Sequence, residues 1–113
     1  MLAEGLSVIN SWGFKYKTMG FLWIKQNKKK DSLFYGMGRW TRGNAEVCLL
    51  ATKGKPKRDS RAVRQLLFHP IGKHSQKPPE VRDKIVELLG DISRIELFAR
   101  DRAKDWDAWG NEI

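Results

Sequence analysis

The sequence predicts an α/β fold, on three observations. Residues 2–12 and 78–89 carry apolar side chains at the spacing of amphipathic helices. Four other segments are apolar runs of strand length. Toward the end of the chain these elements alternate as strand, helix and strand, the order typical of a sheet flanked by helices. A chain of 113 residues is long enough for one such domain.

The first part of the chain predicts a helix followed by a strand. Gly13 ends the helical pattern of residues 2–12. Residues 14–18 then alternate apolar and polar side chains, as a half-buried strand does, and residues 21–24 form a more fully buried run. Gly20 lies between the two runs, and we expect it to interrupt the strand.

The middle of the chain predicts two further strands. Residues 44–52 contain an apolar run without strict alternation, so we expect a central buried strand with Cys48 as a small core residue. Residues 63–68 alternate loosely and predict another strand, which Pro70 stops.

The last part of the chain predicts a helix, a turn and a buried strand. Pro78 and Pro79 suit the first turn of a helix, and the apolar spacing continues to Leu89. Gly90 and the residue after it form a turn signal before the apolar run of residues 95–98. Polar groups at the carboxyl end of such a strand are well placed to hold a ligand.

The positive charge is concentrated in one stretch. Residues 25–64 hold twelve basic and three acidic residues, a net charge of +9, whereas the rest of the chain holds ten of each. Concentrated cations neutralise phosphates, so a polyanion partner is expected. Phe34, Tyr35 and Trp40 lie among these cations and are suited to stacking on bases. Residues 25–43 also have the composition of a long mobile loop, and a solvated loop is the alternative interpretation.

Several classes of protein receive no support. No apolar run is long enough to cross a membrane, and the single Cys48 forms no internal disulfide, which fits a cytoplasmic protein. His69 and His74 have no further ligands at metal-binding spacing, so no metal site is expected. No nucleophile elbow or carboxylate pair suggests hydrolase chemistry.

Polar residues in three segments suggest a binding site. Lys77 stands at the mouth of the second helix, where its charge and the helix dipole both favour an anion such as a carboxylate. Glu96 and Arg100 flank the end of the last predicted strand, and Asn111 and Glu112 follow Gly110. The alternatives are a plain capping segment, solvated charges beside a core strand, and a frayed terminus.

Four segments match one family in order and spacing. They are Trp40-Thr-Arg-Gly-Asn-Ala-Glu-Val-Cys-Leu-Leu-Ala-Thr-Lys-Gly54, Ser75-Gln-Lys-Pro-Pro-Glu80, Ile95-Glu-Leu-Phe-Ala-Arg100 and Trp109-Gly-Asn-Glu112. Over nearly its whole length the chain resembles the adenine-N6 methyltransferases whose catalytic motif is Asp-Pro-Pro-Trp. That family includes the catalytic subunit of the messenger-RNA adenine methyltransferase, and its phage and bacterial members are DNA methyltransferases, including those of restriction-modification systems.

The resemblance implies a Rossmann-like methyltransferase sheet with flanking helices and an S-adenosylmethionine pocket. Lys77 matches the lysine that holds the cofactor carboxylate. Arg100 and Asn111 match residues on the ribose side, and a glutamine or glutamate often occupies the position of Glu112. The strand matching one wall of the pocket contributes Glu96, Leu97 and Phe98. The resemblance and the charge together predict nucleic-acid contacts, with DNA preferred over RNA, from Lys28, Lys29, Lys30, Arg39, Trp40 and Arg42.

One departure from the family bears on activity. Asp-Pro-Pro-Trp occurs nowhere in the 113 residues, although in the family it lies upstream of the segment that residues 2–12 resemble. We therefore expect an incomplete sheet, residues 1–113 being the C-terminal part of a methyltransferase domain that is truncated at its start, with no catalytic residue and little activity alone. The alternatives are a non-catalytic nucleic-acid-binding subunit that completes another chain or a homo-oligomer, and an inactive phage-derived remnant.

Overall fold

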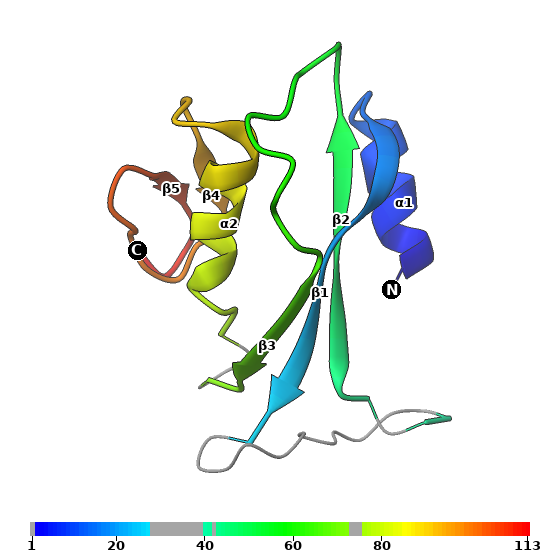
Figure 1. Ribbon diagram of the computed structural model, residues 1–113, viewed down its shortest axis with the longest axis vertical. Helices are drawn as coiled ribbons and strands as arrows, with labels where there is room; N and C mark the ends of the chain where they lie inside the picture. Colours follow the sequence, from blue (N-terminus) through cyan, green and yellow to red (C-terminus); the bar gives the residue numbers. More distant parts are fainter. Residues whose placement is uncertain (1, 28–39, 42, 73–75) are drawn as a thin grey trace.

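A three-stranded sheet forms the centre of the computed structural model, which describes residues 2–27, 40–41, 43–72 and 76–113 (Figure 1). Its strands are β1 (Lys15–Gln26), β2 (Ala45–Thr52) and β3 (Leu66–Pro70), in the order β2-β1-β3. The β1–β2 pair is antiparallel and the β1–β3 pair is parallel. The sheet is therefore mixed, and β1 is its central strand.

Strand β1 is continuous where two separate runs were expected. Its register against β2 shifts between Tyr16 and Thr18 and again between Met19 and Phe21. A Cβ at Gly20 would lie 3.2 Å from the Cβ of Leu50, so the missing side chain lets β2 approach closely here. Gly20 thus marks an irregularity within one strand and does not end it.

Strand β2 has the predicted position along the chain but lies at the edge of the sheet. Val47 and Cys48 are exposed, so the expectations of a central buried strand and of a core cysteine were wrong. An apolar run indicates that a segment prefers burial. It does not indicate whether the strand is central or at the edge, because that depends on how the other strands pair.

Strand β3 begins three residues later than expected and includes Pro70, which was expected to stop it. Proline lacks the N–H of a ladder bond but is tolerated on an edge strand, and β3 is the other edge of this sheet. The backbone N–H of Leu22 also donates to the carbonyl of Gln65 at 2.9 Å, which extends the contact with β1 backwards by one residue.

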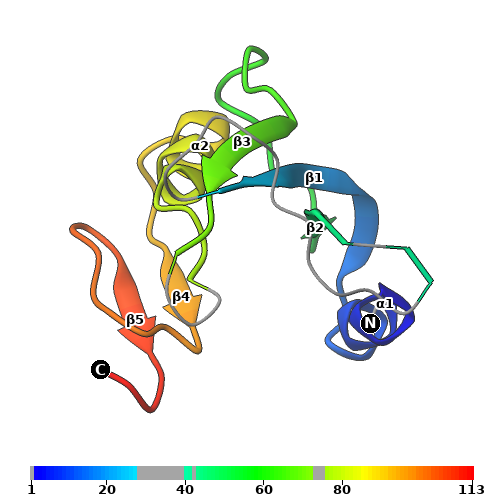
Figure 2. The same cartoon turned by 90° about the horizontal axis from the view of Figure 1, so that it is seen from below.

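Both predicted helices are present within the described residues. Helix α1 (Leu2–Ser11) contacts β1, and helix α2 (Glu80–Leu89) ends at Gly90, whose φ of 86° favours glycine. Helix α2 lies toward the β3 edge of the three-stranded sheet and α1 toward the β2 edge (Figures 1 and 2). The alternation of strands and helices confirms the predicted α/β fold class.

A second, two-stranded parallel sheet lies on the α2 side of the molecule (Figure 2). It pairs β4 (Ile95–Leu97) with β5 (Asp107–Trp109), and β5 was not predicted. Ile95 is 54% exposed, so the expectation of a buried strand here was wrong. Two short strands bury little by themselves, because a sheet gains its burial from the layers that cover it.

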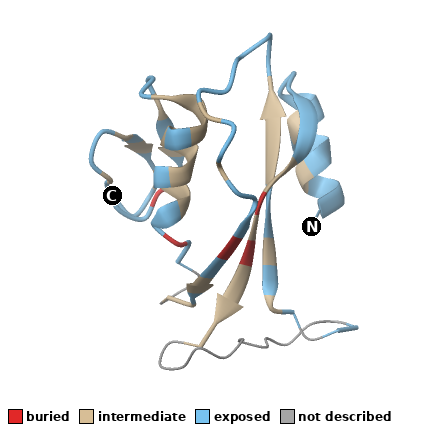
Figure 3. Ribbon diagram, in the orientation of Figure 1, coloured by how far each residue is buried: buried red, intermediate tan, exposed pale blue. Residues whose placement is uncertain are grey.

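The buried core is small, as Figure 3 shows. Its hydrophobic members among the described residues are Phe21, Trp23, Leu67 and Ala99. The first three lie on adjacent strands β1 and β3, and the indole N–H of Trp23 donates to the carbonyl of His69 at 2.9 Å. The core thus lies along the parallel β1–β3 pair.

Candidate functional site

A cavity of about 1030 Å³ lies where the start of α2 faces the residues around β4 and the chain end. We name it the α2–β4 cavity. Its lining includes five of the seven residues expected to hold a cofactor: Lys77, Glu96, Phe98, Arg100 and Glu112. The structure thus brings together side chains that lie up to 35 positions apart in the sequence.

Lys77 precedes the first residue of α2, Glu80, and lines the cavity. The side chain is 62% exposed, and Nζ lies 2.7 Å from Oε2 of Glu46 on β2. Lys25 approaches the other carboxylate oxygen of Glu46 at 3.7 Å. An exposed ion pair of this kind is worth only about 0–1 kcal/mol, so Lys77 can exchange Glu46 for another carboxylate.

Arg82 joins α2 to the wall of the cavity. Its Nε donates to Oε1 of Glu96 at 2.9 Å, and Nη2 lies 2.7 Å from the same oxygen and 3.0 Å from Oδ1 of Asp101. Burial acts to lower the pKa of Arg82, but its hydrogen bonds to Glu96 and Asp101 outweigh that effect and raise the pKa. The Glu96 carboxylate is therefore already held by the protein.

Phe98 presents an aromatic ring in an unusual backbone conformation. Its φ is 59°, in the left-handed region that residues other than glycine rarely adopt. The side chain is 75% exposed, and its ring meets the edge of the Trp109 ring with centroids 5.3 Å apart. An exposed aromatic held in strained backbone at a cavity is a candidate for ligand contact.

Arg100 and Glu112 face each other across the same end of the cavity. Nε of Arg100 lies 3.5 Å from Oε2 of Glu112, and both side chains are about half exposed or more. Together they offer a hydrogen-bond donor and an acceptor, which suits a ligand with hydroxyl groups.

Comparison with known proteins decides the family. The model of the MT-A70 family matches residues 1–112. The chain is also 40% identical, over 114 aligned residues, to the Type II methyltransferase M.MunI of Mycoplasma sp. This chain belongs to the MT-A70 family. The match confirms the adenine-N6 methyltransferase resemblance carried by the four ordered segments.

The alignment covers 99% of this chain and 46% of M.MunI. The chain therefore spans about half the length of this MT-A70 relative. The two remaining cofactor-site expectations, Leu97 and Asn111, are exposed residues outside the lining of the α2–β4 cavity.

Arg82 and Trp106 line the α2–β4 cavity but were not predicted as site residues. Trp106 contributes an indole, and the guanidinium of Arg94 lies over its ring at 5.6 Å. The partners of Arg82, Glu96 and Asp101, are distant in the sequence, so no local pattern marks Arg82 as a site residue.

Of the six residues predicted to contact nucleic acid, the structure describes one. Trp40 is 98% exposed, whereas Lys28, Lys29, Lys30, Arg39 and Arg42 lie outside the described residues. In the described part of the chain, no group of three or more potential metal ligands comes together. None of the helices described is long and apolar enough to span a membrane.

Proposed function

We propose that this MT-A70 chain is the C-terminal part of an S-adenosylmethionine-dependent adenine-N6 DNA methyltransferase domain, spanning residues 1–113. The observation that carries the proposal is the α2–β4 cavity, which gathers Lys77, Phe98, Arg100 and Glu112. Its size is at the upper end of the roughly 300–1000 Å³ that small-molecule sites occupy. A cytoplasmic location is part of the same proposal.

The donor set fits the cofactor. Lys77 is assigned to the methionine carboxylate, which would replace Glu46 as its partner. Arg100, Glu112 and Asn111 are assigned to the ribose hydroxyl groups, and the exposed ring of Phe98 offers a face for the adenine. Glu96 and Leu97 form the strand beside them. S-adenosylmethionine supplies the methyl group when bound.

Target positioning is assigned to polypeptide other than these residues, because Asp-Pro-Pro-Trp is absent from the 113 residues. Two strand edges support this. Among the outer strands of the two described sheets, which are all paired on one side only, β2 and β4 are the two that we assign to this pairing. An unpaired strand offers a row of backbone donors and acceptors to a further strand. We infer that strands carrying the motif pair there and complete a Rossmann-like sheet.

The cofactor assignment is tested by calorimetric titration with S-adenosylmethionine. Lys77→Ala and Arg100→Ala should each weaken binding by about tenfold, since a hydrogen bond to a charged group is worth about 1.5–3 kcal/mol and solvent exposure here reduces that value. Lys84→Ala on α2 is the control, because Lys84 does not line the cavity. Equal affinity in all four proteins would exclude the α2–β4 cavity as the cofactor site.

The completion assignment is tested by adding, in trans, the part of an MT-A70 relative that contains Asp-Pro-Pro-Trp. We expect the 113-residue chain alone to transfer little methyl label to adenine in DNA and the mixture to transfer more. Efficient methylation of DNA by the chain alone would contradict this part of the proposal.

A second candidate function is a non-catalytic partner subunit. The exposed apolar side chains on α1 and β2, including Leu2, Val8 and Val47, favour it because they offer a surface to another chain. Stable association with a motif-bearing partner, without measurable S-adenosylmethionine binding by this chain, would support the subunit over the cofactor-binding domain.

A further inference from the structure

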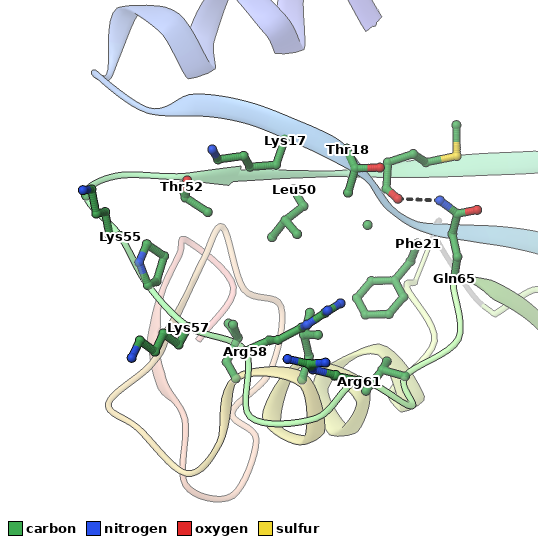
Figure 4. Close-up of a pocket in the computed structure, with 17 residues that line it drawn as sticks. Lys17, Thr18, Phe21, Leu50, Thr52, Lys55, Lys57, Arg58, Arg61 and Gln65 are labelled. Atoms are coloured by element: carbon green, nitrogen blue, oxygen red, sulfur yellow. Dashed lines mark hydrogen bonds between the residues drawn. The ribbon is translucent and has the colours of Figure 1, made fainter.

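A second cavity, of about 830 Å³, lies between strands β1 and β2 and the connection formed by residues 53–65. We name it the basic cavity. Five cations line it, Lys17 from β1 and the others from the connection: Lys55, Lys57, Arg58 and Arg61 (Figure 4). Its described lining contains no aspartate or glutamate. The site is thus strongly positive without internal compensation.

The backbone that carries these cations is anchored at several points. The N–H of Asp59 donates to the carbonyl of Leu88 at the end of α2, at 2.6 Å. Farther along, Nε2 of Gln65 donates to the carbonyl of Met19 at 2.6 Å, a bond drawn in Figure 4. Hydrogen bonds at both ends of residues 59–65 hold this part of the connection against α2 and β1. Arg61 is therefore presented from a fixed wall, and Lys55, Lys57 and Arg58 lie between that wall and the end of β2.

The ion-pair pattern distinguishes this cavity from the α2–β4 cavity. Lys77, Arg82 and Arg100 at the first site all lie within 4 Å of a carboxylate oxygen. By contrast, none of the five cations at the basic cavity pairs with a carboxylate in the part of the chain that the structure describes. All five residues are exposed. Exposed cations without acidic partners are available to an external anion.

We propose that the basic cavity binds backbone phosphates of duplex DNA. Guanidinium groups suit the phosphodiester oxygens because their planar fork donates two parallel hydrogen bonds, and the lysines add point charges at the rim. The hydroxyl groups of Thr18 and Thr52 line the same space and are further donors to phosphate. The inference rests on the proposed function for its ligand, DNA, and assigns the polyanion contact expected of residues 25–64 to a particular cavity, which also includes Lys17 from outside that stretch.

The site is distinct from the predicted contacts around Trp40. Residues 40–44 precede β2 and residues 53–58 follow it, so the two regions lie at opposite ends of an eight-residue strand. At about 3.3 Å per residue the strand spans roughly 25 Å. The basic cavity therefore lies at the other end of β2 from the segment that holds Trp40.

The test compares two triple variants that remove the same charges. Lys55→Gln, Lys57→Gln and Arg58→Gln change the basic cavity, and Lys84→Gln, Arg102→Gln and Lys104→Gln change cations that line neither cavity. Binding to a fluorescein-labelled 20-base-pair duplex is followed by anisotropy across a salt series. We expect the cavity variant to lose about tenfold or more in affinity at low salt. The slope of log binding constant against log salt concentration should become shallower by roughly 2–3, because binding releases about one counterion fewer for each phosphate contact that is lost.

The control variant should change the slope by less than about one, the amount expected for a single phosphate contact. A charge-conserving variant, Lys55→Arg with Lys57→Arg and Arg58→Lys, should keep the salt slope of the unmodified protein, which attributes the loss in the glutamine variant to the removed charges. Equal losses in the cavity and control variants would overturn the proposal, as would absence of salt-dependent binding by the unmodified protein. Displacement of the duplex by micromolar ATP would also overturn it in favour of a free nucleotide site.

Titration of the same variants with S-adenosylmethionine separates this proposal from the proposed function. Loss of DNA binding with unchanged cofactor binding supports the basic cavity. Unchanged DNA binding overturns the basic cavity, whatever the cofactor result. Absence of cofactor binding in every protein would count against the α2–β4 cavity and not against the phosphate contacts.

Discussion

At the residue scale, ion pairs hold the charged side chains of the α2–β4 cavity in place. Lys77 pairs with Glu46, Arg100 with Glu112, and Arg82 with Glu96 and Asp101. The first two pairs are exposed and can exchange for ligand groups, whereas the Arg82 pair is partly buried and fixes the wall. Each pair therefore predicts a different response to mutation.

Glu46→Gln should tighten S-adenosylmethionine binding. The substitution removes the carboxylate that competes with the cofactor for Lys77 while keeping nearly the same side-chain size. An exposed pair is worth about 0.2–1 kcal/mol, so the gain should be at most roughly fivefold. Calorimetric titration measures it, with Glu87→Gln on the exposed side of α2 as the control. Weaker binding by Glu46→Gln would show that Glu46 supports the site.

Arg82→Met should destabilise the wall of the cavity. It leaves the carboxylates of Glu96 and Asp101 without their common partner, and hydrogen bonds to charged groups are worth about 1.5–3 kcal/mol when well formed. Because Arg82 is only partly buried, we expect a loss of roughly 1–2 kcal/mol in the free energy of unfolding. Urea unfolding measures it, and Arg102→Met, which changes an exposed arginine, should have little effect.

At the scale of elements, the close approach of two chain segments holds the α2–β4 cavity together. The N–H of Ala99 donates to the carbonyl of Trp109 at 3.0 Å, which extends the β4–β5 pairing by one residue. A Cβ at Gly110 would lie 2.9 Å from the Ala99 nitrogen and would overlap its carbonyl oxygen. The missing side chain at Gly110 therefore lets the two segments approach closely enough for Phe98, Arg100 and Glu112 to line the same cavity.

Gly110→Ala should separate these segments. The added methyl group meets backbone atoms, which cannot move aside as a flexible side chain can, so a loss of about 1–3 kcal/mol is expected. Gly43→Ala is the matched control, since a Cβ there meets nothing within 4 Å. Thermal unfolding and S-adenosylmethionine titration should both respond to Gly110→Ala and not to Gly43→Ala. Similar melting temperatures for the two variants would contradict the close approach.

The outer edge of β2 can be followed through Cys48. Cys48 is an exposed residue. Neighbouring atoms nevertheless shield its thiol from part of the solvent, and this desolvation raises the pKa of the thiol above its ordinary value. A raised thiol pKa leaves less thiolate at pH 7, so labelling by a thiol reagent should be slow there and accelerate as the pH rises toward 9 and beyond. Adding the motif-bearing polypeptide at pH 8.5 should slow the labelling. Unchanged labelling would place the partner on another surface.

At the scale of the whole molecule, the described residues bury few apolar side chains and expose many. The radius of gyration is 15.1 Å, whereas a compact domain of this length has about 13 Å. Exposed apolar side chains occur on α1, β2 and the β4–β5 pair, among them Leu2, Val47, Ile95 and Trp109. Such a surface is typical of a protein that associates with further polypeptide.

Association should therefore raise stability more than any single substitution. We expect the 113-residue chain to bind a hydrophobic dye and to melt at low temperature, and the motif-bearing polypeptide to displace the dye and raise the melting temperature by several degrees. Dye fluorescence and calorimetry measure the two effects. A high melting temperature without the added polypeptide would show that the chain buries its apolar surface by itself.

The sequence predicted most elements of this fold and the family, because both depend on local patterns. Apolar spacing gave both helices, and four ordered segments gave the MT-A70 resemblance. Strand β5 was missed because three residues ending in a tryptophan carry no periodicity. Arg82 was missed because its partners lie 14 and 19 residues away, beyond any local pattern.

By itself, the sequence determined the α/β order of elements, the concentration of positive charge in residues 25–64 and the residues shared with the MT-A70 family. Only the tertiary structure decided that β2 is an edge strand and that Lys77 faces Glu46. Only the structure, too, placed Lys17 opposite Arg58 and Arg61 on one basic cavity. The reason is physical: periodicity records which face of an element prefers burial, whereas pairing and cavities depend on segments that meet only when the chain is folded.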